Sequence, residues 1–124
     1  MQNRQVPRSE WFTFFKGFSQ RHEDWLVTVR VVSSRLGSQV EARDLPLEGI
    51  VASPDGQGPI SIHVGRAIDK HVEHEVAEPL QVWVELTDEG GEAALEIESR
   101  DGTKTILQFR SAPPPETVDE ILQP

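Results

Sequence analysis

Apolar and polar residues alternate along most of the chain after Trp25, and this alternation constrains the fold more than any other feature of the sequence. Successive side chains of a strand point to opposite faces of a sheet, so a period of two predicts strands with one buried face. Turn residues separate the alternating runs at short intervals, which predicts an antiparallel meander. The expected strands cover residues 25–32, 39–43, 47–52, 60–64, 71–76, 80–87 and the two arms of 93–109.

The register of the last three strands follows from their loops, because facing residues of neighbouring strands must lie on the same face. A four-residue loop at 88–91 and a three-residue loop at 100–102 keep the apolar residues of all three strands on one face. A two-residue turn in the second place would set apolar residues opposite polar ones, so we reject it. We expect Gly102 to adopt a left-handed backbone conformation in the three-residue loop at 100–102. This register sets Glu98 opposite Lys104.

The same register aligns Trp83, Glu96 and Ile106 in one row across the opposite face of these strands. Trp83 and Ile106 form an apolar spot among polar neighbours, and an exposed tryptophan with a polar rim is typical of a binding hot spot. We therefore take these three residues as the candidate binding site. We expect the chain itself to cover the spot, either with its N-terminal helix, which must pack on one face of the sheet, or with its C-terminal tail.

Six of the eight aromatic residues lie between Trp11 and Trp25, where the apolar period is helical. A helix over residues 9–20 would align its aromatic residues in one stripe, which we expect to pack in the core. The sequence therefore predicts an α+β domain, with an N-terminal amphipathic helix packed on an antiparallel, strongly curled β-meander or small barrel of about six to eight strands. We expect residues 1–111 to form this single domain and residues 112–124 to form a proline-rich, acidic C-terminal tail.

Histidine and acidic residues gather near residue 71. On the expected strand His71 and Glu73 share a face, and His63 is a possible third ligand from elsewhere in the chain. A zinc site needs three or four converging ligands, and only two stand at a suitable spacing, so we expect no metal. The alternative is a metal-dependent or small-ligand protein, which could be an enzyme, that uses His63, His71 and Glu73.

The composition excludes several classes of function. The chain has no cysteine, which rules out disulfide scaffolds and thiolate metal sites, and it carries no nucleophile or cofactor-binding motif. Its net charge of −9 disfavours phosphate backbones, so we expect no nucleic acid as partner. No apolar run reaches the roughly 20 residues of a membrane helix, so we expect no membrane association.

The absence of a catalytic set in the sequence favours a binding module over an enzyme. We expect no catalytic residue and no cofactor, and we interpret the chain as a non-catalytic binding or interaction module in the cytoplasm. Because net charge steers encounter, the partner should be a protein of basic character. A homodimer through a sheet face or a sheet edge is the other partner that we consider.

Several segments resemble a small bacterial family of unknown function. They are the opening motif Val6-Pro7-Arg8-Ser9-Glu10-Trp11, the segment from Asp44 to Ile50, and Ile97-Glu98-Ser99-Arg100-Asp101-Gly102-Thr103. The resemblance covers most of the chain and stops before the proline-rich tail. It implies a stand-alone bacterial domain in the cytoplasm, and it implies no activity, cofactor or catalytic residue.

Overall fold

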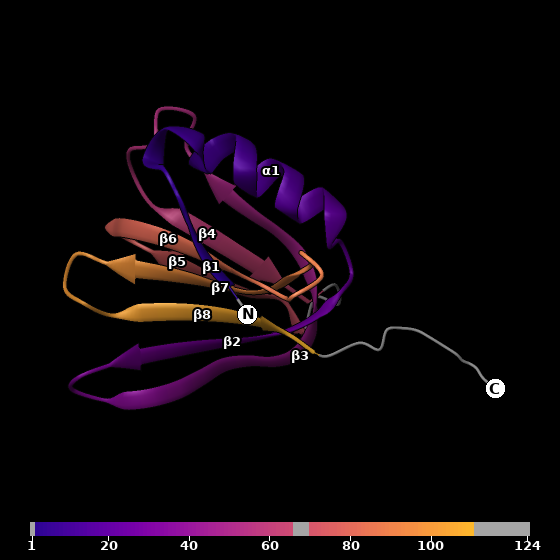
Figure 1. Cartoon of the computed structure of the whole chain (residues 1–124). Helices are drawn as coiled ribbons and strands as arrows, with labels where there is room; N and C mark the ends of the chain where they lie inside the picture. The colour runs from indigo at the N-terminus through magenta and orange to yellow at the C-terminus, as the bar shows by residue number, and fades with distance from the viewer. Residues whose placement is uncertain (1, 66–69, 111–124) are drawn as a thin grey trace.

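The computed structural model describes residues 2–65 and 70–110, which form an antiparallel sheet with one α-helix against it (Figure 1). In this part of the chain eight strands follow the order β1-β6-β7-β8-β2-β3-β4-β5 across the sheet. The elements are β1 (Gln2–Val6), a short 3-10 helix η1 (Arg8–Glu10), α1 (Trp11–Arg21), β2 (Leu26–Ser33), β3 (Gly37–Ala52), β4 (Ile60–Val64), β5 (Val72–Val76), β6 (Pro79–Leu86), β7 (Glu92–Ser99) and β8 (Lys104–Phe109). The expected tail at 112–124 lies outside the described residues.

The sheet is open, with β1 at one edge and β5 at the other. The predicted alternative of a small barrel is therefore wrong, because these two edges are not hydrogen-bonded to each other. The other alternative, a meander, is right only in part, since β8 pairs with β2 and β1 pairs with β6. The sheet nevertheless folds back over itself, since His74 on β5 lies 3.3 Å from the hydroxyl of Thr105 on β8. Among the described residues, no helix is both long and apolar enough to cross a bilayer.

The long strand β3 joins the two halves of the sheet, pairing first with β2 and later with β4. Its register shifts twice against β2 and once against β4. Each shift is a bulge that changes which residues face inward. The inward residues are therefore Ala42 first, then Leu47, then Ile50 and Ala52, all of them buried. From the sequence, only the interruption at Pro46 could be recognised in this stretch, and the bulges were not predicted.

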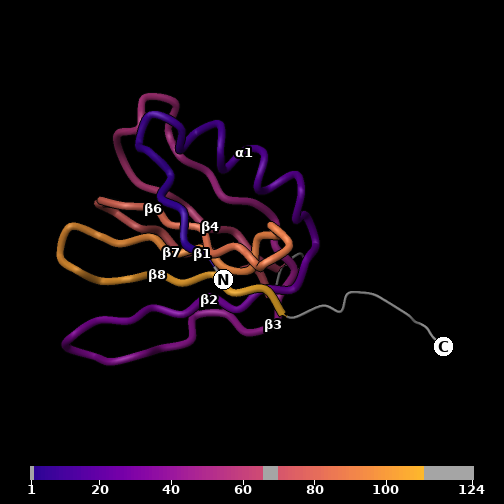
Figure 2. Tube along the Cα trace, in the orientation of Figure 1, coloured from indigo at the N-terminus to yellow at the C-terminus, as the bar shows by residue number. Residues whose placement is uncertain are grey.

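The helix α1 is not the first element, because the polar strand β1 precedes it and pairs with the edge of β6. Sequence reasoning missed β1 since only Val6 of its five residues is buried, so it has no alternating apolar pattern. Three aromatic residues of α1 are fully buried: Trp11, Phe15 and Phe18. The helix lies along one side of the sheet and contacts β3 most extensively (Figure 1, Figure 2).

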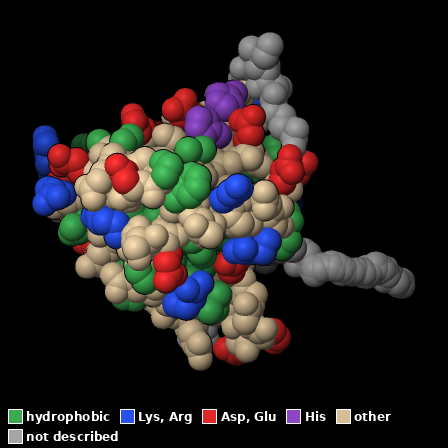
Figure 3. All heavy atoms as spheres, turned by 90° about the horizontal axis from the view of Figure 1, so that it is seen from above, with side chains coloured by type: hydrophobic (Ala, Val, Ile, Leu, Met, Phe, Trp, Pro, Cys, Tyr) green, Lys and Arg blue, Asp and Glu red, His purple; other side chains and the backbone are tan. Residues whose placement is uncertain are grey.

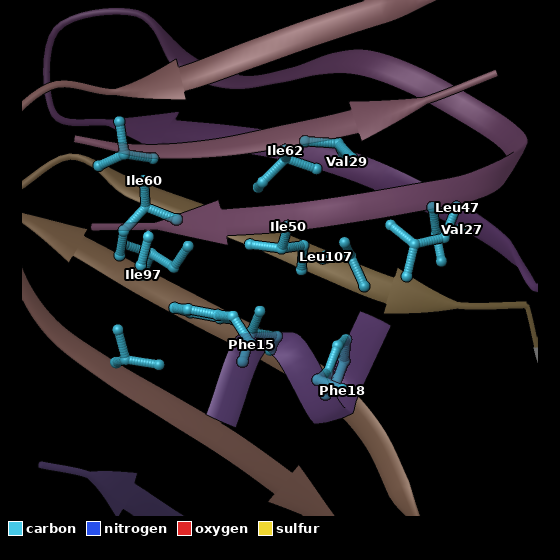
Figure 4. Close-up of a cluster of buried hydrophobic side chains, with 14 of the residues drawn as sticks. Phe15, Phe18, Val27, Val29, Leu47, Ile50, Ile60, Ile62, Ile97 and Leu107 are labelled. Carbon is cyan, nitrogen blue, oxygen red and sulfur yellow. The ribbon is translucent and has the colours of Figure 1, made fainter. Parts of the chain in front are cut away.

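The core lies between α1 and the inward faces of both sheet halves (Figure 4). Phe15 and Phe18 reach from the helix toward the branched aliphatic side chains of the strands. Burial of such side chains is the main term that favours folding in a domain of this size. The labelled core residues are all at most 3% exposed: Phe15, Phe18, Val27, Val29, Leu47, Ile50, Ile60, Ile62, Ile97 and Leu107.

The predicted register of β7 and β8 is confirmed. Leu95 lies opposite Leu107, Glu98 lies opposite Lys104, and Gly102 is left-handed with a φ of 89°. The loop length predicts this register correctly because the inward faces of β7 and β8 are both buried. A slip by one residue would turn all of their apolar side chains toward solvent.

Candidate functional site

The structure aligns Trp83 with Glu96 and Glu96 with Ile106, as the register argument predicted. The same row continues across the neighbouring strands, because each further pair also shares a face. We call it the Trp83 row, and it consists of Gln5, Trp83, Glu96, Ile106, Arg30 and Val40.

The Trp83 row lies on the face of the sheet that is turned away from α1. Val82 and Val84, the chain neighbours of Trp83, are fully buried in the core beneath the helix, so Trp83 points to the other side. The expectation that the N-terminal helix covers Trp83 is therefore wrong. The helix packs instead on the face that carries the continuous aliphatic set, because that face buries more apolar surface. The C-terminal tail, the other expected cover, lies outside the described residues.

A hollow of about 470 Å³ opens over this row. Trp83 and Ile106 contribute apolar surface to it, together with Ala94 and Leu95, and Glu85 and Glu96 provide carboxylates. The Trp83 side chain is half-buried, and its indole N–H donates to Gln81 Oε1 at 3.2 Å. Lys104 lies 4.0 Å from Glu96, so one of the two carboxylates is partly neutralised and Glu85 is left to give the hollow a net negative charge. The arrangement suits noncovalent contact with an apolar and positively charged surface.

A second group of polar side chains lies on β3, on β4 and immediately before β5, where histidine and acidic side chains adjoin in Figure 3. The rings of His63 and His71 are 5.8 Å apart, so the structure does bring these two predicted residues together. The third residue differs from the predicted set: ligand atoms of Glu48, His63 and His71 all lie within 4.8 Å of one another, and Glu73 is not part of this group. Glu73 lies opposite His63 in the β4–β5 register.

Sequence reasoning missed Glu48, which lies on the outward side beside His63, because a strand that alternates without a break through the buried Ile50 and Ala52 would turn Glu48 inward. The register shift between Leu47 and Gly49 is the reason that it lies there. A glycine inside a strand pattern often marks a bulge, so Gly49 was the available signal.

A third polar group, around His22, holds the end of α1 in place. The ring is 4% exposed and packs 4.5 Å from the rings of both Phe18 and Phe109. Its Nδ1–H donates to the Phe18 carbonyl at 2.8 Å, and Nε2 lies 3.4 Å from Glu92. Desolvation by burial lowers the pKa of His22, against the opposing effects of the Phe18 carbonyl and the Glu92 carboxylate. Because this histidine is enclosed by rings, we assign it to the core.

Comparison with known proteins gives relatives without an assigned activity. The sequence model of a family of unknown function, DUF5335, matches residues 2–119. An uncharacterised protein of Aquifex aeolicus is 27% identical over 114 residues, which are 92% of this chain and 97% of that protein. No solved structure shows a significant match.

Proposed function

This chain belongs to the family of unknown function DUF5335, and from the geometry of its sheet we propose that it is a non-catalytic module that binds a basic protein segment over the Trp83 row. One observation carries the proposal. Trp83 stands half-buried in a hollow on the helix-free face of the sheet, between carboxylates and beside a second apolar residue, Ile106.

The apolar part of the hollow supports the role of an anchor. Tryptophan is enriched among the residues that dominate binding energy, and such residues lie near the centre of an interface with a polar surround. Trp83 has Glu96 on one side and Gln5 on the other in the row, so its apolar surface is framed by polar groups. Its indole N–H is already satisfied by Gln81, so a partner can cover the ring without leaving that donor unpaired.

The charges favour a partner that carries lysine or arginine. The chain has a net charge of −9, which attracts cationic partners at long range. At short range Glu85 and Glu96 line the hollow together with the cation Lys104, and Arg30 lies next in the row, beyond Ile106 and outside the lining of the hollow. Electrostatic complementarity of this kind raises the association rate more than the affinity, and added salt weakens it.

Selection from a random peptide library displayed on phage tests this proposal with the intact chain as target. We expect the selected peptides to combine lysine or arginine with one large apolar residue. The Trp83→Thr variant, which keeps a residue of high strand propensity, should bind these peptides at least tenfold more weakly. The control is Val51→Thr, because Val51 is 59% exposed on β3 and lies outside the hollow. This control should stay within twofold of the parent.

Two results would contradict the proposal. One is equal binding of the selected peptides by the parent chain and Trp83→Thr. The other is a concentration-dependent dimer, seen by light scattering, that Trp83→Thr abolishes; the row would then be the interface between two copies of the chain instead of a site for a basic segment.

A further inference from the structure

We propose that Glu48, His63 and His71 form a binding site for a divalent transition-metal cation of the Zn²⁺ type, with three protein ligands and one position left to water. This inference does not depend on the proposed function. The three side chains come from β3, from β4 and from the residue immediately before β5, whereas the Trp83 row crosses β1, β6, β7, β8, β2 and the first part of β3.

The distances are those of a nearly formed site. In a tetrahedral zinc site with bonds of about 2.0–2.1 Å, two ligand atoms are about 3.3 Å apart. His71 Nδ1 lies 3.3 Å from Glu48 Oε1, so this edge of the tetrahedron already has its final length. The ligand atoms of the three residues all lie within 4.8 Å of one another, which is at most about 1.5 Å more than an edge of a tetrahedral site.

The ligand chemistry selects the metal class. Two imidazole nitrogens and one carboxylate oxygen suit Zn²⁺ and its neighbours in the first transition row. Magnesium and calcium take oxygen ligands, so they fit this set poorly. Glu73, opposite His63 in the register, places a second acidic residue on the neighbouring strand.

The bulge in β3 brings Glu48 into the group. Leu47 and Ile50 are both buried, so the two residues between them must both lie on the outward side. The hydroxyl of Ser19 on α1 fixes this irregular stretch, since it accepts the Ile50 N–H at 2.8 Å and donates to the Ile50 carbonyl at 3.3 Å. Bulges often redirect side chains at functional sites, and the result here is a carboxylate beside His63.

A close approach between Gly65 and Lys70 lies beside the site. Gly65 has a φ of 85°, and its N–H donates to the Pro46 carbonyl at 2.8 Å. A Cβ atom at this position would lie 2.2 Å from the Lys70 carbonyl oxygen, so only glycine allows residues 65 and 70 to approach this closely. The approach sets His71 directly beside the end of β4.

The Glu48–His71 contact alone does not account for the cluster. The two side chains are 51% and 40% exposed, and an exposed ion pair contributes little to stability. It also does not include His63, whose ring lies 5.8 Å from the ring of His71. A cation shared by all three side chains accounts for their convergence.

Calorimetric titration of the intact, chelator-treated chain with Zn²⁺ tests the site. We expect one zinc ion per chain, with the dissociation constant raised at least tenfold in Glu48→Gln, His63→Ala and His71→Ala. Glu75→Gln is the matched control, because Glu75 is exposed on β5 opposite Ser61 and outside the group. It should change the dissociation constant less than twofold.

A second measurement separates ligation from unspecific binding. Co²⁺ in place of Zn²⁺ should give the visible absorption of a tetrahedral complex, and each of the three variants should lose it while keeping the circular dichroism of the parent. Zinc binding that persists unchanged in Glu48→Gln, or the absence of one-to-one binding by the parent chain, would overturn the proposal and reduce the contact to an ion pair.

Discussion

Replacing Arg8 should destabilise the fold more than replacing any exposed cation, because its side chain joins three segments of the chain. Its guanidinium lies 4.4 Å from the centre of the Trp11 ring. Nη1 donates to the Gly56 carbonyl at 2.7 Å and Nη2 donates to the Pro79 carbonyl at 3.1 Å. Gly56 has a φ of 75°, and a Cβ there would come within 3.2 Å of the Arg8 carbonyl oxygen, so the two residues fit each other closely.

The expected loss follows from these three contacts. A hydrogen bond from a charged group contributes about 1.5–3 kcal/mol, and a cation–π contact contributes about 0.5–2 kcal/mol. The contacts share one side chain and are partly solvated, so they do not add fully. We expect Arg8→Ala to lower the free energy of unfolding by about 2–4 kcal/mol, which corresponds to roughly 10 °C in Tm at this chain length. Arg8→Lys should lose about half as much, because a single ammonium cannot bridge both carbonyls.

Urea unfolding at neutral pH, followed by circular dichroism, measures the change. The slope against urea should stay constant, which would show that the native and unfolded states keep their compactness. Lys16→Ala is the control on the exposed side of α1 and should stay within about 0.5 kcal/mol of the parent. An Arg8→Ala variant as stable as this control would refute the reasoning, and the Pro-Arg-Ser-Glu-Trp motif would then need a role other than holding the fold together.

Three further perturbations have defined outcomes. Burial lowers the pKa of His22 from 6.5, so on acidification the histidine takes up a proton in the unfolded state before it does so in the folded state. The urea midpoint should therefore fall as the pH drops below about 6.5. The His22→Gln variant should show a weaker dependence of the urea midpoint on pH. Phe18→Ala empties a fully buried site and should cost about 3–5 kcal/mol in the same urea assay. Ser19→Ala leaves the Ile50 N–H without its side-chain acceptor and should cost about 1–2 kcal/mol, and a loss below 0.3 kcal/mol would mean that the hydroxyl does not fix the bulge.

The parts of the fold that the sequence predicted are those in which one face of a strand is buried and the loops are short. The β7–β8 register is the clearest case, because the loop length and the apolar parity leave one solution. The strand β1 could not be found in this way. Its residues bond to β6 through the backbone, and backbone pairing leaves no trace in the side-chain pattern.

The two candidate sites differ in how many of their residues could be predicted from the sequence. The row through Trp83, Glu96 and Ile106 follows from register alone, so the sequence predicted its members. Its exposure depends on where α1 packs, and a local pattern does not contain that information. The helix could have covered either face of the sheet until the whole aliphatic set was assembled in space.

The position of Glu48 shows why the third ligand of the proposed metal site could not be predicted from residue spacing in the sequence. The strand β3 must bury Leu47 against one part of the core and Ile50 against another, and these two positions have opposite parity. A one-residue bulge reconciles them, and its consequence is two successive residues on the outward side. One of these is Gly49, whose missing Cβ would lie 3.8 Å from the Ser19 hydroxyl; the other is Glu48, directed toward His63. Because both Leu47 and Ile50 are buried, the Glu48 carboxylate lies on the outward side of β3, where it can act as a ligand together with His63 and His71.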